Sequence, residues 1–426
     1  MVDQVLRRRK KLTMQPAQNT GDDRILFLDN TRYLLVLLVV VFHSAAAYVF
    51  HATYWPIVDH KSILFDLLAR TLDVFLMPAL FFIAGYFALP SLRKKTTGHF
   101  IKTKIKRLGI PWLIGVMLMG PIKDFIYYYS VNQGFIDLWR VFLTKIKIAL
   151  MFGTGFVTQS PEFDHLHFWF ISLLLSFFIV FALLHKIIRK RFADSFSSEI
   201  SVVPSNMQIL LVLFLVSIVS TVSTLVSFAF FSQGHGAEPW MTIGSVIQFQ
   251  PTRLSLYIIC FSLGIYAFCK SWFINGNVPG HYVFWIFLSI ALWFAHDRFL
   301  SVLMEDLKPG AAVFCIFTRT LLFFSILFTL VSLGERFWDS ASRVHRSLAK
   351  NGYNIYLVHM VFVYLVQTIL LDWMQLSVYI KFLVVSLSAI LLSYAFSRYA
   401  IKPYPKFSVA AMVVIFAILS ISTSSS

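Results

Sequence analysis

Long apolar runs constrain the fold of this chain more than any other feature of its sequence. A helix that crosses the hydrocarbon core of a bilayer needs about 20 mainly apolar residues. Only 13% of the residues are charged, against about 25% in a soluble protein. This excludes a water-soluble enzyme, a disordered chain and a nucleic-acid-binding domain. Ten strong runs and a weaker eleventh lie near residues 33–50, 68–89, 109–129, 167–185, 207–231, 253–269, 281–300, 311–333, 352–371, 378–398 and 407–421.

The basic residues predict how these helices are oriented. The chain has 37 Lys and Arg against 20 Asp and Glu, a net charge of +17. Lys and Arg concentrate in cytoplasmic loops, and here basic clusters follow every second apolar run. The N-terminus is therefore predicted to be cytoplasmic, and most of the positive charge reports orientation. The clusters are Arg7–Lys11, Arg93–Arg107, Lys186–Arg191, Lys270, Arg336–Lys350 and Arg398–Lys406.

The predicted fold is an all-α polytopic membrane protein with ten or eleven transmembrane helices. Residues 1–26 form a cytoplasmic tail, 27–406 a single membrane domain, and 407–426 an apolar segment with a short tail. The three cysteines show no metal-ligand spacing, and no His, Asp or Glu pair stands four residues apart within one membrane helix. We therefore expect neither a metal site nor a disulfide.

The first apolar run contains the most informative pair of polar residues. Arg32 and His43 are separated by ten apolar residues. Eleven residues at about 100° each return to within about 20° of the start, so both side chains share one helix face, about 16 Å apart. An ionisable residue inside a membrane helix indicates function by default. The alternative is that Arg32 anchors the helix end and His43 makes a structural hydrogen bond.

The spacing Arg-x10-His in a first membrane helix resembles the signature of the acyltransferase 3 family of integral membrane acyltransferases. Four further segments follow in the family's order and extend the resemblance over most of the chain. Within the family, the chain is most similar to the branch that includes the glucan biosynthesis protein C succinyltransferases. The four segments are Phe81–Tyr86 (FFIAGY), Lys104–Pro111 (KIKRLGIP), His167–Phe170 (HFWF) and Tyr353–His359 (YNIYLVH).

The resemblance implies O-acyl transfer, in which a base removes the proton of a hydroxyl group. A neutral imidazole in an apolar setting can act as that base at pH 7, and His43 is the candidate. The chain contains no GxSxG motif and no Cys/His pair close in sequence. None of its twelve histidines has Asp at the fifth following position, which excludes the HxxxxD motif. Direct transfer from a thioester to a hydroxyl is therefore the simpler mechanism.

A base of this kind usually has an orienting partner. Asp66, Arg70 and Asp73 are spaced four and three residues apart in the second apolar run, so they lie on one helix face. Asp73 is predicted to orient His43. The alternative is a self-contained Asp–Arg pair that closes the mouth of the helix.

The expected donor is cytoplasmic acyl-CoA, bound through its phosphates by Arg32, Lys104 and Arg107. Basic side chains suit phosphate, although any inner loop is basic, which is the alternative for the Arg93–Arg107 stretch. The expected acceptor is a carbohydrate or envelope glycan, which arrives from the outer side and carries the hydroxyl that receives an acetyl or succinyl group. We expect a bacterial inner (plasma) membrane and no nucleic-acid partner.

Three further residues are candidates for binding the substrate: Glu162, His167 and His359. For Glu162 the alternative is a solvated rim, and for each histidine a structural hydrogen bond. His167 begins its helix from the outer side, whereas His359 lies about two turns in from the inner side. Their depths differ, so we expect that both cannot touch one reacting atom without bent helices.

Trp55, near the outer surface, is expected to be an interfacial anchor, with a sugar-stacking role as the alternative. A secondary transporter of a small solute or proton, using the same intramembrane charges, is the competing function. Transporters often show internal repeats, and none is found in this sequence.

Overall fold

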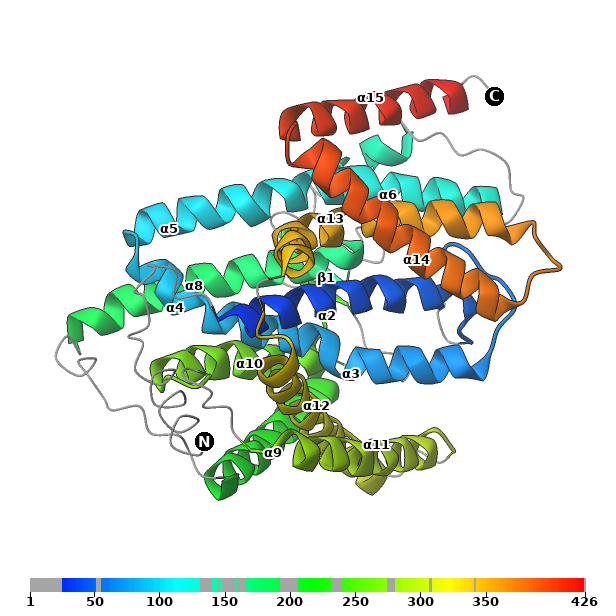
Figure 1. Cartoon of the computed structure of the whole chain (residues 1–426). Helices are drawn as coiled ribbons and strands as arrows, with labels where there is room; N and C mark the ends of the chain where they lie inside the picture. The colour runs from blue at the N-terminus through cyan, green and yellow to red at the C-terminus, as the bar shows by residue number, and fades with distance from the viewer. Residues whose placement is uncertain are drawn as a thin grey trace, which may run out of the picture.

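The computed structural model describes residues 25–50, 55–130, 140–144, 146–147, 158–159, 165–191, 206–231, 240–273, 280–305, 309–340 and 342–424. These residues form a bundle of helices with one very small sheet (Figure 1). The long helices are α2 (Leu26–Ala45), α3 (Ile63–Tyr86), α6 (Ile110–Ser130), α8 (Trp169–Arg191), α9 (Asn206–Phe231), α10 (Pro251–Cys269), α11 (Tyr282–Glu305), α12 (Pro309–Phe337), α13 (Arg343–Leu371), α14 (Val378–Phe396) and α15 (Pro405–Ser424). The shorter ones are η1 (Ala46–Tyr48), α4 (Ala88–Arg93), α5 (Thr97–Lys104), η2 (Ile105–Gly109), η3 (Leu166–Phe168) and η4 (Ser397–Ile401).

In the described part of the chain, 10 helical segments are long and apolar enough to cross a membrane. They coincide with the ten strong apolar runs, which confirms the predicted all-α polytopic fold. The weaker eleventh run is also helical, as α15, but its described apolar part, Pro405–Ile418, is shorter than a span. The apolar runs become helices because a backbone in hydrocarbon must satisfy its hydrogen bonds internally.

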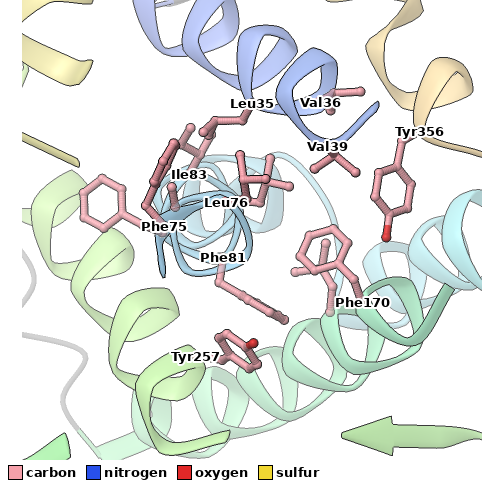
Figure 2. Packing of buried hydrophobic residues seen from close by; sticks show 14 of the residues in the cluster. Leu35, Val36, Val39, Phe75, Leu76, Phe81, Ile83, Phe170, Tyr257 and Tyr356 are labelled. Atoms are coloured by element: carbon pink, nitrogen blue, oxygen red, sulfur yellow. The ribbon is translucent and has the colours of Figure 1, made fainter. Parts of the chain in front are cut away.

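The core of the bundle is built where α2 and α3 pack together. Figure 2 shows Leu35 and Val39 of α2 pointing toward Leu76 and Ile83 of α3. On its other side, α3 places Phe81 against Tyr257 of α10 and Phe170 of α8, with ring centroids 4.8 Å and 4.9 Å away. Consequently α3 lies between α2 and α10, and it fixes the position of the helix that carries His43.

The contact between α3 and α10 is close because two glycines face each other's backbone. A Cβ atom on Gly85 would lie 2.0 Å from the carbonyl oxygen of Phe261. A Cβ atom on Gly264 would lie 2.1 Å from the carbonyl oxygen of Phe82. Small residues allow helix backbones to approach in membranes, where no hydrophobic force draws helices together. The FFIAGY segment, which contains Gly85, therefore lies at a close crossing of two helices.

The basic segment, Lys104–Pro111, contains a helical turn that is wider than an α-helical one. Residues Ile105–Gly109 form a π-helix between α5 and α6, and a single π turn inside an α-helix is frequent at functional sites. The segment therefore rotates its side chains relative to a regular helix. A second π-helix, η4, follows α14.

The strands β1 (Thr158–Gln159), β2 (Met241–Ile243) and β3 (Ile247–Phe249) form an antiparallel sheet in the order β1-β2-β3. Thr158 pairs with Thr242, and Thr242 pairs with Gln248. The side chain of Gln248 accepts a hydrogen bond of 2.9 Å from the backbone N–H of His165. The sheet thus holds the turn η3, which leads into α8.

Candidate active site

Three histidines from three helical segments meet inside the bundle. His43 lies near the end of α2, His167 in the turn η3, and His359 in the middle of α13. The ring centroids of His43 and His359 are 5.1 Å apart, and those of His167 and His359 are 4.9 Å apart. His167 and His359 are buried, whereas His43 is partly exposed. The expectation that His167 and His359 lie at different depths was therefore wrong.

A chain of hydrogen bonds defines which nitrogen of His43 is basic. Nδ1 of His359 lies 2.8 Å from the carbonyl oxygen of Tyr356. A carbonyl oxygen only accepts, so Nδ1 of His359 carries the proton, and in the neutral ring its Nε2 is then an acceptor. That Nε2 lies 3.0 Å from Nδ1 of His43. His43 consequently donates from Nδ1, and the lone pair on its Nε2 remains available to take a proton.

The indole of Trp55 forms a wall beside His43. The two rings are stacked, with centroids 5.8 Å apart and planes at 12°. Nε1 of Trp55 donates to Oε1 of Gln367 at 2.9 Å, and Nε2 of Gln367 donates to the carbonyl oxygen of Ser44 at 3.1 Å. The imidazole of His43 is thereby held between an aromatic face and His359, which fixes the orientation of its ring.

A buried ion pair anchors the loop that carries Trp55. Lys381 of α14 is fully buried, and its Nζ lies 2.7 Å from Oδ2 of Asp59. The same loop accepts a hydrogen bond at the carbonyl of Pro56 from Ser130, and the backbone N–H of Asp59 donates to the carbonyl of Ala47. These contacts hold the loop against the end of α2.

His167 reaches the cluster through an unusual backbone conformation. Leu166 has φ of 51°, a region that a residue with a bulky side chain seldom occupies and that marks stored strain at functional sites. The turn buries both neighbouring histidines, His165 and His167. The hydroxyl of Tyr356 donates a hydrogen bond to the carbonyl of His167, which ties the turn to α13.

Helix α13 connects the segments that the sequence singled out. Tyr353 donates from its hydroxyl to the carbonyl of Arg107 at 2.6 Å, and the Arg107 guanidinium lies 5.8 Å from the centre of the same ring. One turn on, Tyr356 contacts His167, and His359 contacts His43. The YNIYLVH segment therefore joins the basic segment to the histidine cluster.

The basic residues expected to bind the donor lie near one another. Lys104 is close enough to Arg107, Lys95 and Arg32 for mutual electrostatic repulsion. Its ammonium group lies 3.5 Å from the centre of the Phe178 ring. Arg107 is exposed, and Arg32 is ion-paired at 2.9 Å with Asp29, one turn earlier on α2. The structure thus brings the three predicted residues to one end of the bundle.

The prediction that Asp73 orients His43 was wrong. Its two carboxylate oxygens lie 2.7 Å from Arg253 of α10 and 2.8 Å from Arg319 of α12. The orienting contact of His43 comes from His359, on a helix that lies more than 300 residues further along the chain. The Asp–Arg alternative also needs correction, because the partners of Asp73 come from other helices. A carboxylate inside a membrane helix requires partners, and for Asp73 these are the arginines of the neighbouring helices α10 and α12.

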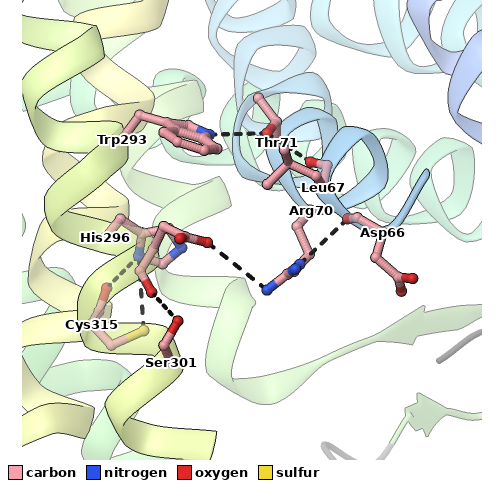
Figure 3. A network of polar contacts seen from close by, with 9 residues as sticks. Asp66, Leu67, Arg70, Thr71, Trp293, His296, Ser301 and Cys315 are labelled. Carbon is pink, nitrogen blue, oxygen red and sulfur yellow. Dashed lines mark hydrogen bonds and ion pairs between the residues drawn. The ribbon is translucent and has the colours of Figure 1, made fainter. Parts of the chain in front are cut away.

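The other two charged residues of α3, Asp66 and Arg70, also contact groups other than His43. Figure 3 shows that Arg70 lies between α3 and α11. Its Nε donates to the carbonyl of Asp66 at 3.4 Å, and its NH1 lies 3.9 Å from Asp297. The carboxylate of Asp66 accepts from the backbone N–H of Phe50 at 3.1 Å. These residues join helices and fasten the loop after α2.

The sequence also offered Glu162 as a substrate-binding residue and predicted no metal site. Glu162 lies outside the described residues. Within the described residues, no group of three or more His, Cys, Asp or Glu side chains is arranged to hold a metal ion.

Sequence reasoning missed two members of the site. Trp55, expected to be an interfacial anchor, also packs against the ring of His43. Gln367 received no role, although a buried amide inside an apolar helix is a signal of function. Tyr356 stood within the YNIYLVH segment, but nothing in that segment indicated which contacts its hydroxyl makes.

The fold and this cluster define a class: a multi-pass membrane protein with three clustered histidines inside its helix bundle. Residues 25–398 match the model of the acyltransferase 3 family, which is described as an acyltransferase domain. The chain therefore belongs to the acyltransferase 3 family and is an integral membrane acyltransferase. The comparisons with curated proteins and with solved structures gave no match.

Proposed function

We propose that this protein transfers a short acyl group, acetyl or succinyl, from acyl-CoA to a hydroxyl of a carbohydrate or envelope glycan, with His43 as the general base. The observation that carries the proposal is the hydrogen-bond chain from Tyr356 through His359 to His43. It leaves a lone pair on Nε2 of the one partly exposed histidine of the cluster. An ordered, neutral imidazole beside an aromatic wall is suited to accept a hydroxyl proton.

The reaction follows from the position of that lone pair. Nε2 of His43 takes the proton of the acceptor hydroxyl while the hydroxyl oxygen forms a bond to the thioester carbonyl carbon. The carbonyl electrons move to the oxygen and then return as the carbon–sulfur bond breaks. The thiolate of CoA leaves and receives the proton from the His43 imidazolium. The products are an ester and free CoA, and the enzyme returns to its starting state.

The proposed donor site is the basic segment with Arg32. Its guanidinium and ammonium groups can bind the phosphates of CoA, and Tyr353 connects this segment to the helix of His359. We propose that this end of the bundle is cytoplasmic, with the N-terminus on the same side. The acceptor then approaches His43 from the other side, and the protein resides in a bacterial inner membrane.

Neutralising the basic segment tests the donor site. The double variant Lys104→Met/Arg107→Ala is expected to raise KM for acyl-CoA by about tenfold or more, because each charge-assisted hydrogen bond contributes roughly 1.5–3 kcal/mol. Methionine keeps an unbranched apolar side chain of similar length beside Phe178 while removing the ammonium group that contacts its ring. Steady-state release of free thiol measures KM. The matched control is Lys406→Ala, which removes an exposed basic residue elsewhere, and an equal rise in both proteins contradicts the assignment.

Removing the wall beside the base tests how His43 is held. Trp55→Ala is expected to lower kcat by about 10- to 100-fold, because loss of orientation near a reacting group is costly. Trp55→Phe keeps an aromatic face and is expected to retain more activity than Trp55→Ala. Trp373→Ala, which removes an exposed tryptophan beyond the end of α13, is the control. Full activity in Trp55→Ala contradicts the positioning role.

The decisive test of the proposed function uses the purified protein in detergent or nanodiscs. The wild type is expected to consume acetyl-CoA or succinyl-CoA in the presence of a glycan acceptor, measured as thiol release. Mass spectrometry of envelope glycans from cells with and without the gene then identifies the acyl group and acceptor together. We propose succinyl transfer to a glucan first, following the similarity to the glucan biosynthesis protein C branch. No consumption of either thioester overturns the proposal.

A further inference from the structure

His167 is the member of the histidine cluster whose polar atoms have no assigned partner. Its side chain is buried, with 5% of its surface exposed. Among the described residues, neither Nδ1 nor Nε2 of this ring makes a hydrogen bond. Backbone groups of Tyr356 and Leu357 interact electrostatically with the ring, but neither makes a hydrogen bond of full geometry to it. A buried polar group without a partner costs about 1–3 kcal/mol, so this ring needs an explanation.

The His167 ring lies beside the other two histidines of the cluster. Its centroid lies 6.3 Å from that of His43 and 4.9 Å from that of His359. Two hydrogen bonds in series, at ~2.9 Å each, span nearly the 6.3 Å between the His167 and His43 centroids, and the ring nitrogens lie off those centroids. A small polar group between His167 and His43 can therefore contact both rings. The positive φ of Leu166 maintains this placement at the cost of local strain.

We propose that His167 donates a hydrogen bond from its imidazole N–H to the carbonyl oxygen of the acyl thioester and stabilises the negative charge that develops there. The inference rests on the proposed function and adds a second catalytic residue to it. A neutral imidazole always carries one N–H, so no change of protonation is required of His167. Its burial makes the hydrogen bond stronger than it would be in water.

The division of labour between the two histidines balances the reaction. His43 receives the hydroxyl proton, and the new carbon–oxygen bond places two electrons on the thioester oxygen. His167 holds that oxyanion without transferring its own proton. When the carbonyl forms again, the carbon–sulfur bond breaks, and the thiolate takes the proton back from His43. His167 ends the cycle unchanged.

A structural role for the ring predicts different behaviour. The His167 ring also packs against Phe168, at a centroid distance of 4.0 Å, and against Tyr356, at 5.5 Å. If packing were its whole contribution, His167→Phe would preserve it, because phenylalanine retains a planar ring without donor atoms. The two roles can therefore be separated by comparing His167→Phe with His167→Gln, which keeps an N–H donor.

The kinetic experiment measures thiol release by both variants in nanodiscs. Loss of one oxyanion donor lowers kcat by about 10²–10³-fold, and this loss is expected for His167→Phe with KM for acyl-CoA unchanged within about twofold. His167→Gln is expected to retain more of kcat than His167→Phe. Equal kcat in His167→Phe and wild type, or equal losses in both variants, overturns the inference. His43→Ala serves as the inactive reference.

A spectroscopic measurement tests the contact directly. The probe is a ketone analogue of acetyl-CoA in which a methylene group replaces the thioester sulfur, so that it binds without reacting. Its infrared carbonyl band is expected at lower frequency on wild type than on His167→Phe. Identical bands on the two proteins overturn the inference while wild-type turnover still supports the proposed function. Failure of the wild type both to bind the analogue and to consume acyl-CoA overturns both proposals.

Discussion

His43→Ala is expected to lower kcat for acyl transfer by about 10²–10⁴-fold, the contribution typical of a positioned general base. The physical reason is that no other described nitrogen in the cluster combines a free lone pair with partial exposure. Nε2 of His359 is occupied by His43, and His167 is buried. Thiol release from acyl-CoA in the presence of acceptor measures the loss. The control His281→Ala removes an exposed histidine from the start of α11 and is expected to leave kcat unchanged.

The orienting role of His359 makes this prediction more specific. His359→Phe removes the acceptor of the His43 Nδ1 proton and is expected to lower kcat less than His43→Ala does. Residues that act as a unit show effects that do not add. The double variant is therefore expected to be no slower than His43→Ala alone. Additive losses, or a fully active His43→Ala, contradict the assignment of the base and its partner.

Gly264→Val is expected to prevent α3 and α10 from packing and so to abolish the folded protein. A Cβ atom at this position meets the backbone of α3, with Phe82 O at 2.1 Å and Tyr86 N at 2.7 Å. Backbone atoms cannot move aside as a flexible side chain can, so the cost exceeds the roughly 1–3 kcal/mol usual for overpacking. The yield of monodisperse protein on size exclusion and its melting temperature measure the effect.

A matched glycine supplies the control for this prediction. Gly310, near the start of α12, has open space where a Cβ atom would be built. Gly310→Ala is therefore expected to be expressed and to melt like the wild type, and Gly85→Ala is expected to resemble Gly264→Val. A stable and active Gly264→Val protein contradicts the close crossing of the two helices.

The helices could be predicted because each depends on its own residues. About 20 apolar residues in a row form a membrane helix whatever their neighbours are, and the ten strong runs all became helices long enough to span. Membership of the family could also be predicted from the sequence, because the motifs are local and keep their order. The candidate base was visible for the same reason: His43 is the polar residue that follows ten apolar ones.

The partners of the candidate base could not be predicted because they depend on packing between distant segments. His43 and His359 are separated by 316 positions and meet only where α2 packs against α13. His167 reaches them through a turn in which Leu166 has positive φ, and no pattern in the sequence predicted that turn. Asp73 was assigned to His43 because it shares one face of the second membrane helix with two other charged residues, but the packing of α3 on α10 and α12 gave it two arginines.

The sequence by itself determined the membrane helices, the family and the identity of the candidate base, since apolar length and short motifs act locally. Only the tertiary structure decided what surrounds that base: His359 at its Nδ1, Trp55 on its ring face and His167 opposite it. The physical reason is that a hydrogen bond or a ring contact requires atoms within a few ångströms of each other. That proximity is created by close helix crossings such as Gly85 with Gly264, and not by spacing along the chain.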